Sequence, residues 1–310
     1  MNSFFQYFLI GILVATLCAC NSGDNSSDNS ADKESSNSLS VVDFSGSTVS
    51  LQQPAKRIVA LAPHLVENTF SAGAGDRLVG VVEFSDFPLA ATKLPIVGGY
   101  EKTNHERILE LNPDLVLTWQ SGNSHSSIEL LRELGLTIYV NQADTLEEVA
   151  KSIRDIGTLA GTSEKAEKAA TSYLEILAKV GEKYKDAKKV TSFYQVWNSP
   201  LQTISGNHII SNAIEICGGE NIYQDELAIA PIINIESVLK RDPEAIIASG
   251  MSSARPEWLN EWKRWDSLQA VQKNNLFFVN PDHIQRHTVR LLDGINRICI
   301  QLDLARARNK

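Results

Sequence analysis

An internal duplication constrains the fold of this chain more than any single motif does. The segments Glu106–Trp119 and Glu236–Ser249 share one pattern: Glu first, Leu three residues later, Pro seven residues later, then an acidic residue and an apolar run. This order predicts a short helix that stops before the proline and is followed by a buried strand. Two copies of the pattern predict two equivalent lobes within one chain.

The residues that precede the two copies also correspond. Arg57 opens an apolar stretch followed by a helix that ends near Gly73, and Thr203 leads into a helix that ends at Cys217 with Gly218 after it. A glycine after the last helical turn supplies the left-handed cap. Each half therefore reads strand, helix, strand, helix, strand, which predicts an α/β unit with a mainly parallel sheet.

A helical segment separates the two halves. No strand pattern occurs between Thr145 and Lys189, and we predict a long amphipathic helix that begins near Ser163. Its apolar stripe is formed by Ala166, Ala169, Tyr173, Leu177, Val180 and Tyr184. The predicted boundaries are an N-terminal lobe at 41–145, a linking segment at 146–188 and a C-terminal lobe at 189–310. Because one stiff helix leaves little hinge motion, we expect a preformed cleft at the C-terminal ends of both sheets.

The first forty residues have a different character from the rest of the chain. Residues 4–17 are apolar, as in a signal peptide, and residues 1–20 are predicted to be a lipoprotein signal because the sequence before Cys20 resembles a lipobox. Residues 1–7 contain no Lys or Arg, which leaves an uncleaved anchor as the alternative. Residues 21–40 are polar and predict a flexible tether. By resemblance to the sorting signals of lipoproteins, Asn21 after the cysteine favours anchoring to the outer membrane.

The remaining cysteines and the net charge bear on the disulfide pairing and on the kind of partner. Cys217 and Cys299 are the two cysteines outside the predicted leader, and in an exported protein they predict a disulfide, with two separate buried thiols as the alternative. The net charge is −8 and no basic patch carries interleaved aromatic residues, so nucleic acid is not an expected partner.

Aromatic residues follow the predicted strands. After the strands near residues 78–82, 96–97, 115–117 and 192–196 come Phe84, Phe87, Tyr100, Trp119 and Trp197. Flat rings at these positions suit a large planar apolar ligand, because each adds contact area at little cost in conformational entropy. The alternative is that individual rings belong to the core.

Two glutamates occupy matching positions in the duplicated pattern. Glu106 and Glu236 begin equivalent helices, where the helix dipole favours a carboxylate. One interpretation is N-terminal capping alone. The other is that one carboxylate on each lobe docks on basic residues of a partner with twofold symmetry.

Five segments carry a family resemblance. They are Glu83–Pro88, Asn104–Ile108, Asn112–Val116, Trp119–Asn123 and Glu215–Ile222. In order and spacing this region resembles the periplasmic cobalamin-binding proteins of ABC importers, from about Arg57 to Leu302. The resemblance implies two Rossmann-like lobes joined by a single long helix, and no catalytic activity. It also implies cobalamin or a related corrinoid as the transported ligand, and a monomer that docks on an inner-membrane permease dimer.

The same resemblance assigns roles to individual residues. Ligand contact is implied for Phe84, Tyr100, Trp119 and the loop Asp282, His283, Ile284, Gln285 and Arg286. Docking on the transporter is implied for Glu106 and Glu236, and the family disulfide for Cys217 with Cys299. A tryptophan that the family carries near Ala230 is absent, and Ile229 and Ala230 occupy that place.

The sequence agrees less well with three other functions. The chain has no nucleophile elbow, phosphate-binding loop or zinc-protease motif, so an enzyme is not expected. His283 and His287 could share a helical face and hold a metal, although a pair of ligand-facing polar residues in a loop is the preferred interpretation. A haem- or ferric-siderophore-binding protein of the same architecture is the main alternative, and Tyr100 could reach a haem iron.

Overall fold

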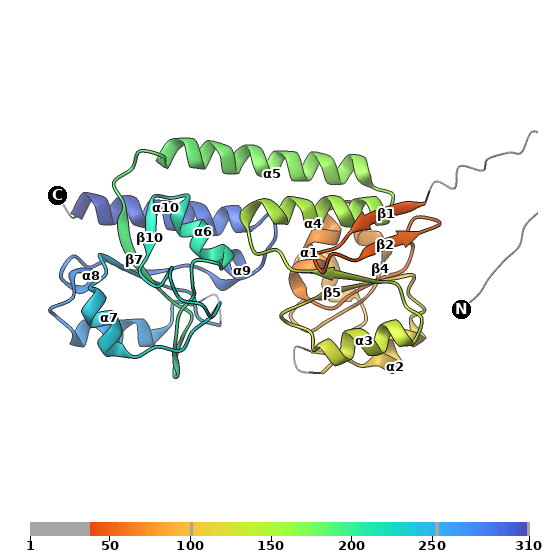
Figure 1. Cartoon of the computed structure of the whole chain (residues 1–310), viewed down its shortest axis with the longest axis horizontal. Coiled ribbons are helices and arrows are strands. Elements are labelled where there is room, and N and C mark those ends of the chain that lie inside the picture. Colours follow the sequence, from red (N-terminus) through yellow and green to blue (C-terminus); the bar gives the residue numbers. More distant parts are fainter. Residues whose placement is uncertain (1–37, 100–101, 252–253, 309–310) are drawn as a thin grey trace, which may run out of the picture. The chain divides into compact units, whose positions relative to one another are not determined.

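The computed structural model describes residues 38–99, 102–251 and 254–308. The N-terminal lobe contains a sheet with strand order β4-β3-β5-β6, in which every pair is parallel. Its strands are β3 (Ile58–Ala60), β4 (Leu78–Val81), β5 (Leu115–Trp119) and β6 (Ile138–Asn141). Strand β3 and the first four residues of β5 are buried, as expected for the centre of a parallel sheet covered on both faces (Figure 1).

The C-terminal lobe repeats this sheet. Its order is β10-β7-β11-β12, again parallel throughout, so both sheets place the first strand second and the second strand at the edge. The strands are β7 (Val190–Gln195), β10 (Gly219–Asn221), β11 (Ala245–Ala248) and β12 (Leu276–Phe278). The predicted fold class, two α/β lobes with parallel sheets, is confirmed.

The pairing of the halves differs from the sequence prediction in one respect. The counterpart of β3 is β7, whereas Thr203 follows a small hairpin of β8 (Trp197–Asn198) and β9 (Leu201–Gln202). The hairpin is inserted between β7 and the next helix. For this reason the sequence comparison paired the stretch at Arg57 with residues that follow the hairpin, and not with β7. The predicted strand at 96–97 is reduced to an isolated bridge between Ile96 and Val81.

Short helices connect the strands of each sheet. The N-terminal lobe has α1 (Pro63–Ser71), α2 (His105–Glu110) and α3 (His125–Glu133). The C-terminal lobe has α6 (Ile209–Glu215), α7 (Ile235–Arg241), α8 (Gln269–Gln272) and α9 (Pro281–Ile284). Single 3-10 segments occur at Gly75–Arg77, Leu89–Lys93 and Glu257–Arg264. Helices α2 and α7 are the two copies of the duplicated pattern, and each ends before its proline as predicted.

Three longer helices form a layer over the two lobes (Figure 1). They are α4 (Leu146–Leu159), α5 (Ser163–Tyr184) and α10 (Leu291–Arg308). A capping box between Thr145 and Glu148 fixes the start of α4. Helix α5 begins at Ser163, as predicted, and buries Ala166, Tyr173 and Leu177. At a rise of about 1.5 Å per residue it is roughly 33 Å long, and it runs beside α4 and α10 over both lobes (Figure 1).

The start of the described chain forms a hairpin. Strand β1 (Leu39–Val42) pairs antiparallel with β2 (Thr48–Leu51). The last two residues of the predicted tether, 39 and 40, therefore belong to a strand. The hairpin is held to the sheet because Phe44 N donates to Val140 O at 3.0 Å. The predicted signal peptide, Cys20 and most of the tether lie outside the described residues. Within the described ranges, no helix is long and apolar enough to span a membrane.

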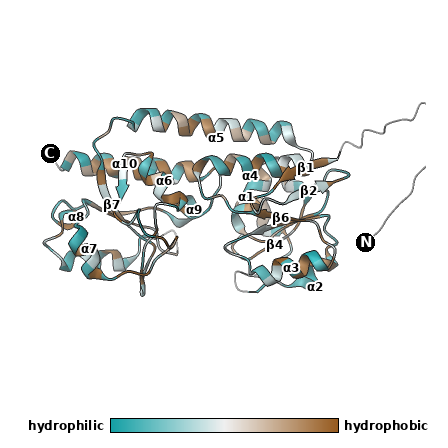
Figure 2. Cartoon of the chain, viewed as in Figure 1, coloured by the Kyte–Doolittle hydropathy of each residue, from teal (hydrophilic) through white to brown (hydrophobic). Residues whose placement is uncertain are grey.

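The largest hydrophobic core is shared by both lobes and the linking helices. It contains Leu65 of α1, Ile153 of α4, Leu177 of α5, Ile210 of α6 and Ile295 of α10. Figure 2 shows the hydrophobic residues concentrated along the strands and on the inner side of this layer. The predicted disulfide between Cys217 and Cys299 is confirmed, and it joins the end of α6 to α10. One continuous core implies that the lobes do not swing freely.

Candidate ligand-binding cleft

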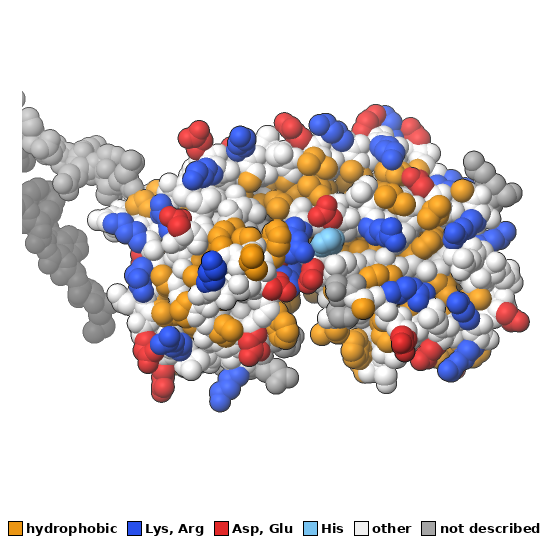
Figure 3. Space-filling view, turned by 180° about the vertical axis from the view of Figure 1, so that it is seen from behind, with side chains coloured by type: hydrophobic (Ala, Val, Ile, Leu, Met, Phe, Trp, Pro, Cys, Tyr) orange, Lys and Arg blue, Asp and Glu red, His pale blue; other side chains and the backbone are white. Residues whose placement is uncertain are grey.

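A cleft of about 510 Å³ lies where the C-terminal ends of the two sheets meet. Trp119 is the last residue of β5, and Val196 directly follows β7. The residues that line the cleft are Trp119, Ser121, Gln142, Asp144, Val196, Ile204, His208, Ile209, Ile210, Ile229, Ala230, Gln285 and His287. Figure 3 shows the surface hollowed between the lobes, with hydrophobic side chains beside the hollow. This is the crevice in which open parallel sheets bind ligands.

The two walls of the cleft differ in chemistry. The N-terminal lobe contributes one ring, Trp119, and otherwise polar residues, among them Gln142 and Asp144. The C-terminal lobe contributes an aliphatic wall of Val196, Ile204, Ile209, Ile210, Ile229 and Ala230. Such a site combines a broad apolar contact with a few polar groups that fix the ligand's orientation.

A string of three histidines leads from the cleft into the interior. His208 and His287 line the cleft with ring centroids 6.2 Å apart. Behind them His64 of α1 lies 5.7 Å from His287 and packs edge-on against Trp119 at 5.2 Å. The three rings come from three separate elements of both lobes and meet only in the folded chain.

Burial keeps these imidazoles uncharged. It lowers the pKa of His64 to about 4, a shift that a hydrogen bond with Asn141 only partly offsets. It also lowers the pKa of His208 to about 4. The pKa of His287 lies well below its ordinary value because of burial and then the neighbouring rings of His64 and His208. The string is therefore neutral at physiological pH.

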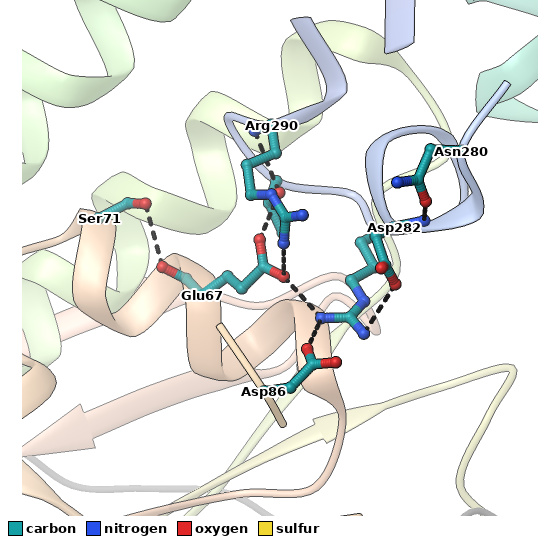
Figure 4. Close-up of polar contacts among 8 residues, drawn as sticks. Glu67, Ser71, Asp86, Asn280, Asp282 and Arg290 are labelled. Atoms are coloured by element: carbon teal, nitrogen blue, oxygen red, sulfur yellow. Dashed lines mark hydrogen bonds and ion pairs between the residues drawn. The ribbon is translucent and has the colours of Figure 1, made fainter. Parts of the chain in front are cut away.

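Ion pairs beside the cleft tie the lobes together (Figure 4). Glu67 of α1 has a side chain that is only 2% exposed, and Oε1 accepts from Nη1 of both Arg286 and Arg290 at 3.0 Å. Thr288 donates its hydroxyl to the second oxygen of Glu67 at 3.0 Å. Arg286 also pairs with Asp86 at 2.6 Å and with Asp282 at 2.9 Å.

The charges of this network are mutually compensated. Burial alone would raise the pKa of Asp86, but hydrogen bonding to Arg286 and its positive charge lower it below its ordinary value. Burial opposes the charge of Arg286, yet its bonds to Asp86 and Glu67 raise its pKa. Since both arginines are engaged by carboxylates, neither offers a free cation to a ligand in the cleft. The segment between α9 and α10 is thereby fixed against the N-terminal lobe.

Several predicted ligand residues take part in this arrangement, in different ways. Trp119 and Gln285 line the cleft. Asp282 and Arg286 belong to the ion-pair network. Ile284 is fully buried in the core, which gives it a packing role.

His283 lies away from this cleft. It lines a separate pocket with Asn296 and Arg297 of α10. It also diverges from His287, because α9 ends at Ile284 and the two side chains do not share a helical face. Among the described residues, no group of three or more His, Cys, Asp or Glu side chains is arranged to hold a metal.

The other predicted aromatic residues do not line the cleft within the described chain. Phe84 is 73% exposed, with a left-handed backbone at φ 63°. The guanidinium of Arg290 stacks over the ring of Phe87, 4.1 Å from the ring centroid. Trp197 is 37% exposed, and its Nε1 donates to Ser199 O at 2.9 Å. Tyr100 lies outside the described residues.

Sequence reasoning missed His208 and the aliphatic wall. The signal for His208 is local but weak: it is the N-cap of α6, and its Nδ1 accepts from Ile210 N at 3.1 Å. His64 and His287 have no pattern that relates them to His208 in the sequence.

The mirrored glutamates occupy equivalent, exposed positions in the first turns of α2 and α7. Their helices are capped by asparagines: Asn104 accepts from Arg107 N at 3.0 Å, and Asn234 from Ser237 N at 2.8 Å. The glutamates therefore do not provide the caps. In the described part of the chain neither carboxylate has an ion-pair partner.

Comparison with known proteins identifies the class to which this architecture belongs. Residues 58–283 match the model of the periplasmic binding protein family, and the chain belongs to this family. It is 35% identical to the vitamin B12-binding protein of Vibrio parahaemolyticus over 256 residues, which are 83% of this chain and 92% of the relative. The resemblance predicted from the sequence is thus confirmed.

Solved structures agree with this assignment. The chain is similar to the periplasmic vitamin B12-binding protein of Vibrio cholerae, with a TM-score of 0.75, 35% identity and coverage of 82% of this chain and 98% of the other. A periplasmic haem-binding protein from Roseiflexus has a TM-score of 0.70 at 18% identity, with coverage of 81% and 99%. At that identity the second likeness shows the fold alone.

Proposed function

We propose that this protein captures cobalamin or a related corrinoid in the inter-lobe cleft and delivers it to the permease of an ABC importer. The observation that carries the proposal is the cleft itself, with an aliphatic wall on one lobe and Trp119 with polar groups on the other. A corrin is a broad, largely apolar macrocycle with amide side chains, and such walls complement it. The names of the relatives at 35% identity support the same ligand.

The protein binds and releases its ligand without chemistry in this proposal. Trp119 and Gln285 contact the ligand from the cleft, and Phe84, Tyr100 and Trp197 are proposed to add rings from the adjoining loops. Asp282 and Arg286 hold the loop that carries Gln285, and His283 is proposed as a further contact from the separate pocket that it lines. The protein is proposed to act as a monomer in the periplasm, anchored to a membrane through a lipid on Cys20.

Titration calorimetry of the purified full chain tests ligand capture. Cyanocobalamin and dicyanocobinamide should each bind with a stoichiometry of one, and haemin should bind more weakly. Tighter binding of haemin would support the haem-binding alternative and contradict the proposal.

Glu106 and Glu236 are proposed to dock on basic residues of the permease dimer, one on each lobe. Replacing both with Ala should abolish corrinoid uptake by cells and leave the affinity for cobalamin unchanged, because neither side chain lines the cleft. The matched control replaces the exposed glutamates Glu133 and Glu175 with Ala, which makes the same change in charge. Loss of cobalamin affinity in the first double variant would refute the docking role.

A further inference from the structure

The cleft presents no positive charge among the described residues that line it. Its only charged side chain there is Asp144, a carboxylate. The neighbouring Arg286 is engaged by Glu67, Asp86 and Asp282. The nearby imidazoles are neutral because burial lowers the pKa of His208 to about 4 and holds that of His287 far below its ordinary value. A carboxylate on a ligand would be desolvated here with no cation to pair with.

The hydrogen bonds already made by His208 fix its remaining capacity. Its Nδ1 accepts from the backbone N–H of Ile210, so in the neutral ring the proton resides on Nε2. Nε2 has no partner among the described residues, and the ring lines the cleft. His208 therefore offers a ligand one hydrogen-bond donor. It cannot ligate a metal through Nε2 without moving the proton to Nδ1 and losing the helix cap.

Gln285 offers the complementary group. Its Nε2 donates to Ser249 Oγ at 2.7 Å and to Gly250 O at 3.2 Å, which leaves Oε1 as an acceptor. Asp144 is a second acceptor, and it is held because Gln142 Nε2 donates to Oδ1 at 2.7 Å. The donor of His208 and the acceptors of Gln285 and Asp144 together match a primary amide, which has one carbonyl oxygen and two N–H groups. A carboxylate has no N–H group for either acceptor.

We infer that the cleft selects an uncharged macrocycle that carries primary amides over one that carries carboxylates, and that His208 is a specificity-determining residue that donates from Nε2 to an amide carbonyl. This inference rests on the proposed function and names the chemical class that the same site accepts. The recognised feature is the amide, whichever corrinoid carries it.

Two corrins that share one ring and differ in their side chains test the selectivity. Dicyanocobinamide carries amide side chains, and dicyanocobyrinic acid carries carboxylates on the same ring. The full chain should bind the acid at least about 100-fold more weakly, because an unpaired carboxylate is costly to desolvate. Equal affinities would overturn the inference and leave the proposed function standing. Binding of neither corrin would overturn both.

Two substitutions separate the ligand role of His208 from its capping role. His208→Asn keeps an acceptor near the position of Nδ1 and removes the Nε2 donor, so Tm should be retained while cobinamide binds about tenfold more weakly. His208→Gln keeps a donor at the reach of Nε2 and loses the cap, so Tm should fall while affinity stays within about threefold. Unchanged cobinamide affinity in His208→Asn would assign His208 a structural role only.

Asp144→Asn tests whether the negative charge on the N-terminal wall of the cleft contributes to this selectivity. The amide retains an acceptor for Gln142 but removes the negative charge that repels ligand carboxylates, so the preference for cobinamide over cobyrinic acid should narrow severalfold. An unchanged preference would contradict the role of this wall.

Absorbance provides a readout that a merely structural role would not affect. Bound diaquocobinamide should keep the spectrum of water-ligated cobalt, since His208 presents an N–H. A shift to nitrogen-ligated bands that disappears in His208→Asn would overturn the inferred tautomer and its role as a donor.

Discussion

The two lobes share a backbone plan but not a chemistry. Both have sheets of the same strand order, and both copies of the repeated helix are capped by an asparagine and carry an exposed glutamate in the first turn. At the cleft, however, the N-terminal lobe presents Trp119 with polar groups, and the C-terminal lobe presents an aliphatic wall. The repeated backbone plan therefore does not extend to the residues that line the cleft. The two walls can contact different features of one ligand.

The lobes also differ in how they are held. The C-terminal lobe has the disulfide between Cys217 and Cys299, and the described part of the N-terminal lobe has none. The segment after α9 meets the N-terminal lobe through Glu67 and through Asn68, whose Nδ2 donates to His287 O at 3.0 Å. These contacts fix the C-terminal polar residues opposite Trp119.

The largest effect is expected where the two lobes are joined. Glu67→Gln removes a buried carboxylate that two arginines share, and the free energy of unfolding should fall by about 3–5 kcal/mol. Chemical denaturation measures the change. Glu167→Gln, which breaks the exposed pair of Glu167 with Arg154, is the control and should leave stability nearly unchanged. Equal effects of the two substitutions would show that the network does not couple the lobes.

Removing the disulfide should destabilise one lobe selectively. Cys217→Ser with Cys299→Ser opens a link between residues 82 positions apart, and the free energy of unfolding should fall by about 2–4 kcal/mol. Hydrogen exchange would locate the change. Faster exchange in α6 and α10 is expected, with β3 and β5 unaffected. Uniform acceleration through both sheets would show that the disulfide does not act on the C-terminal lobe selectively.

Acidification should act through the histidine string. In the folded protein the pKa of His64 and of His208 is about 4, against about 6.5 in the unfolded chain, so the unfolded state binds more protons between these values. The contribution of these histidines to the free energy of unfolding is fully present above pH 6.5. It is lost as the pH falls towards 4, by up to about 3 kcal/mol for each ring.

One substitution isolates the contribution of His208 to this loss. His208→Asn keeps the cap but removes one titrating ring, so its stability should decline less steeply between pH 6.5 and 4 than that of the unsubstituted protein. Thermal unfolding across this pH range provides the measurement. Parallel profiles would show that His208 does not titrate with folding.

The smallest expected effect tests the aliphatic wall. Ile229→Ala removes part of a half-exposed side chain at the cleft, and cobalamin should bind about fivefold more weakly, with little change in Tm. Ile176→Ala on α5 is the control, because Ile176 is similarly exposed, at 41% against 47% for Ile229, and lies outside the cleft. If both variants bind like the unsubstituted protein, the wall contributes no affinity.

The sequence predicted those features that depend on local order. The repeated Glu, Leu and Pro spacing fixed α2 and α7, the apolar stripe fixed α5 from Ser163, and an exported chain with two remaining cysteines indicated the disulfide. Each of these follows from periodicity, capping or composition, which short segments carry by themselves.

The cleft required the tertiary structure. His64, His208 and His287 are more than 70 residues apart along the chain, and no local spacing predicts that their rings meet. Trp197 does follow β7 as predicted, but it starts the β8–β9 hairpin, and the hairpin determines where its side chain lies. The end of a strand could be predicted from sequence, whereas the direction of the side chain after it could not.

Anomalous diffraction at the cobalt absorption edge, from crystals of the full chain grown with cyanocobalamin, tests the central claim most directly. A single cobalt peak should lie in the cleft, between Trp119 on the N-terminal lobe and the Ile229 wall on the C-terminal lobe. A peak elsewhere on the protein, or a liganded crystal with no ordered cobalt in the cleft, would contradict corrinoid capture between the lobes.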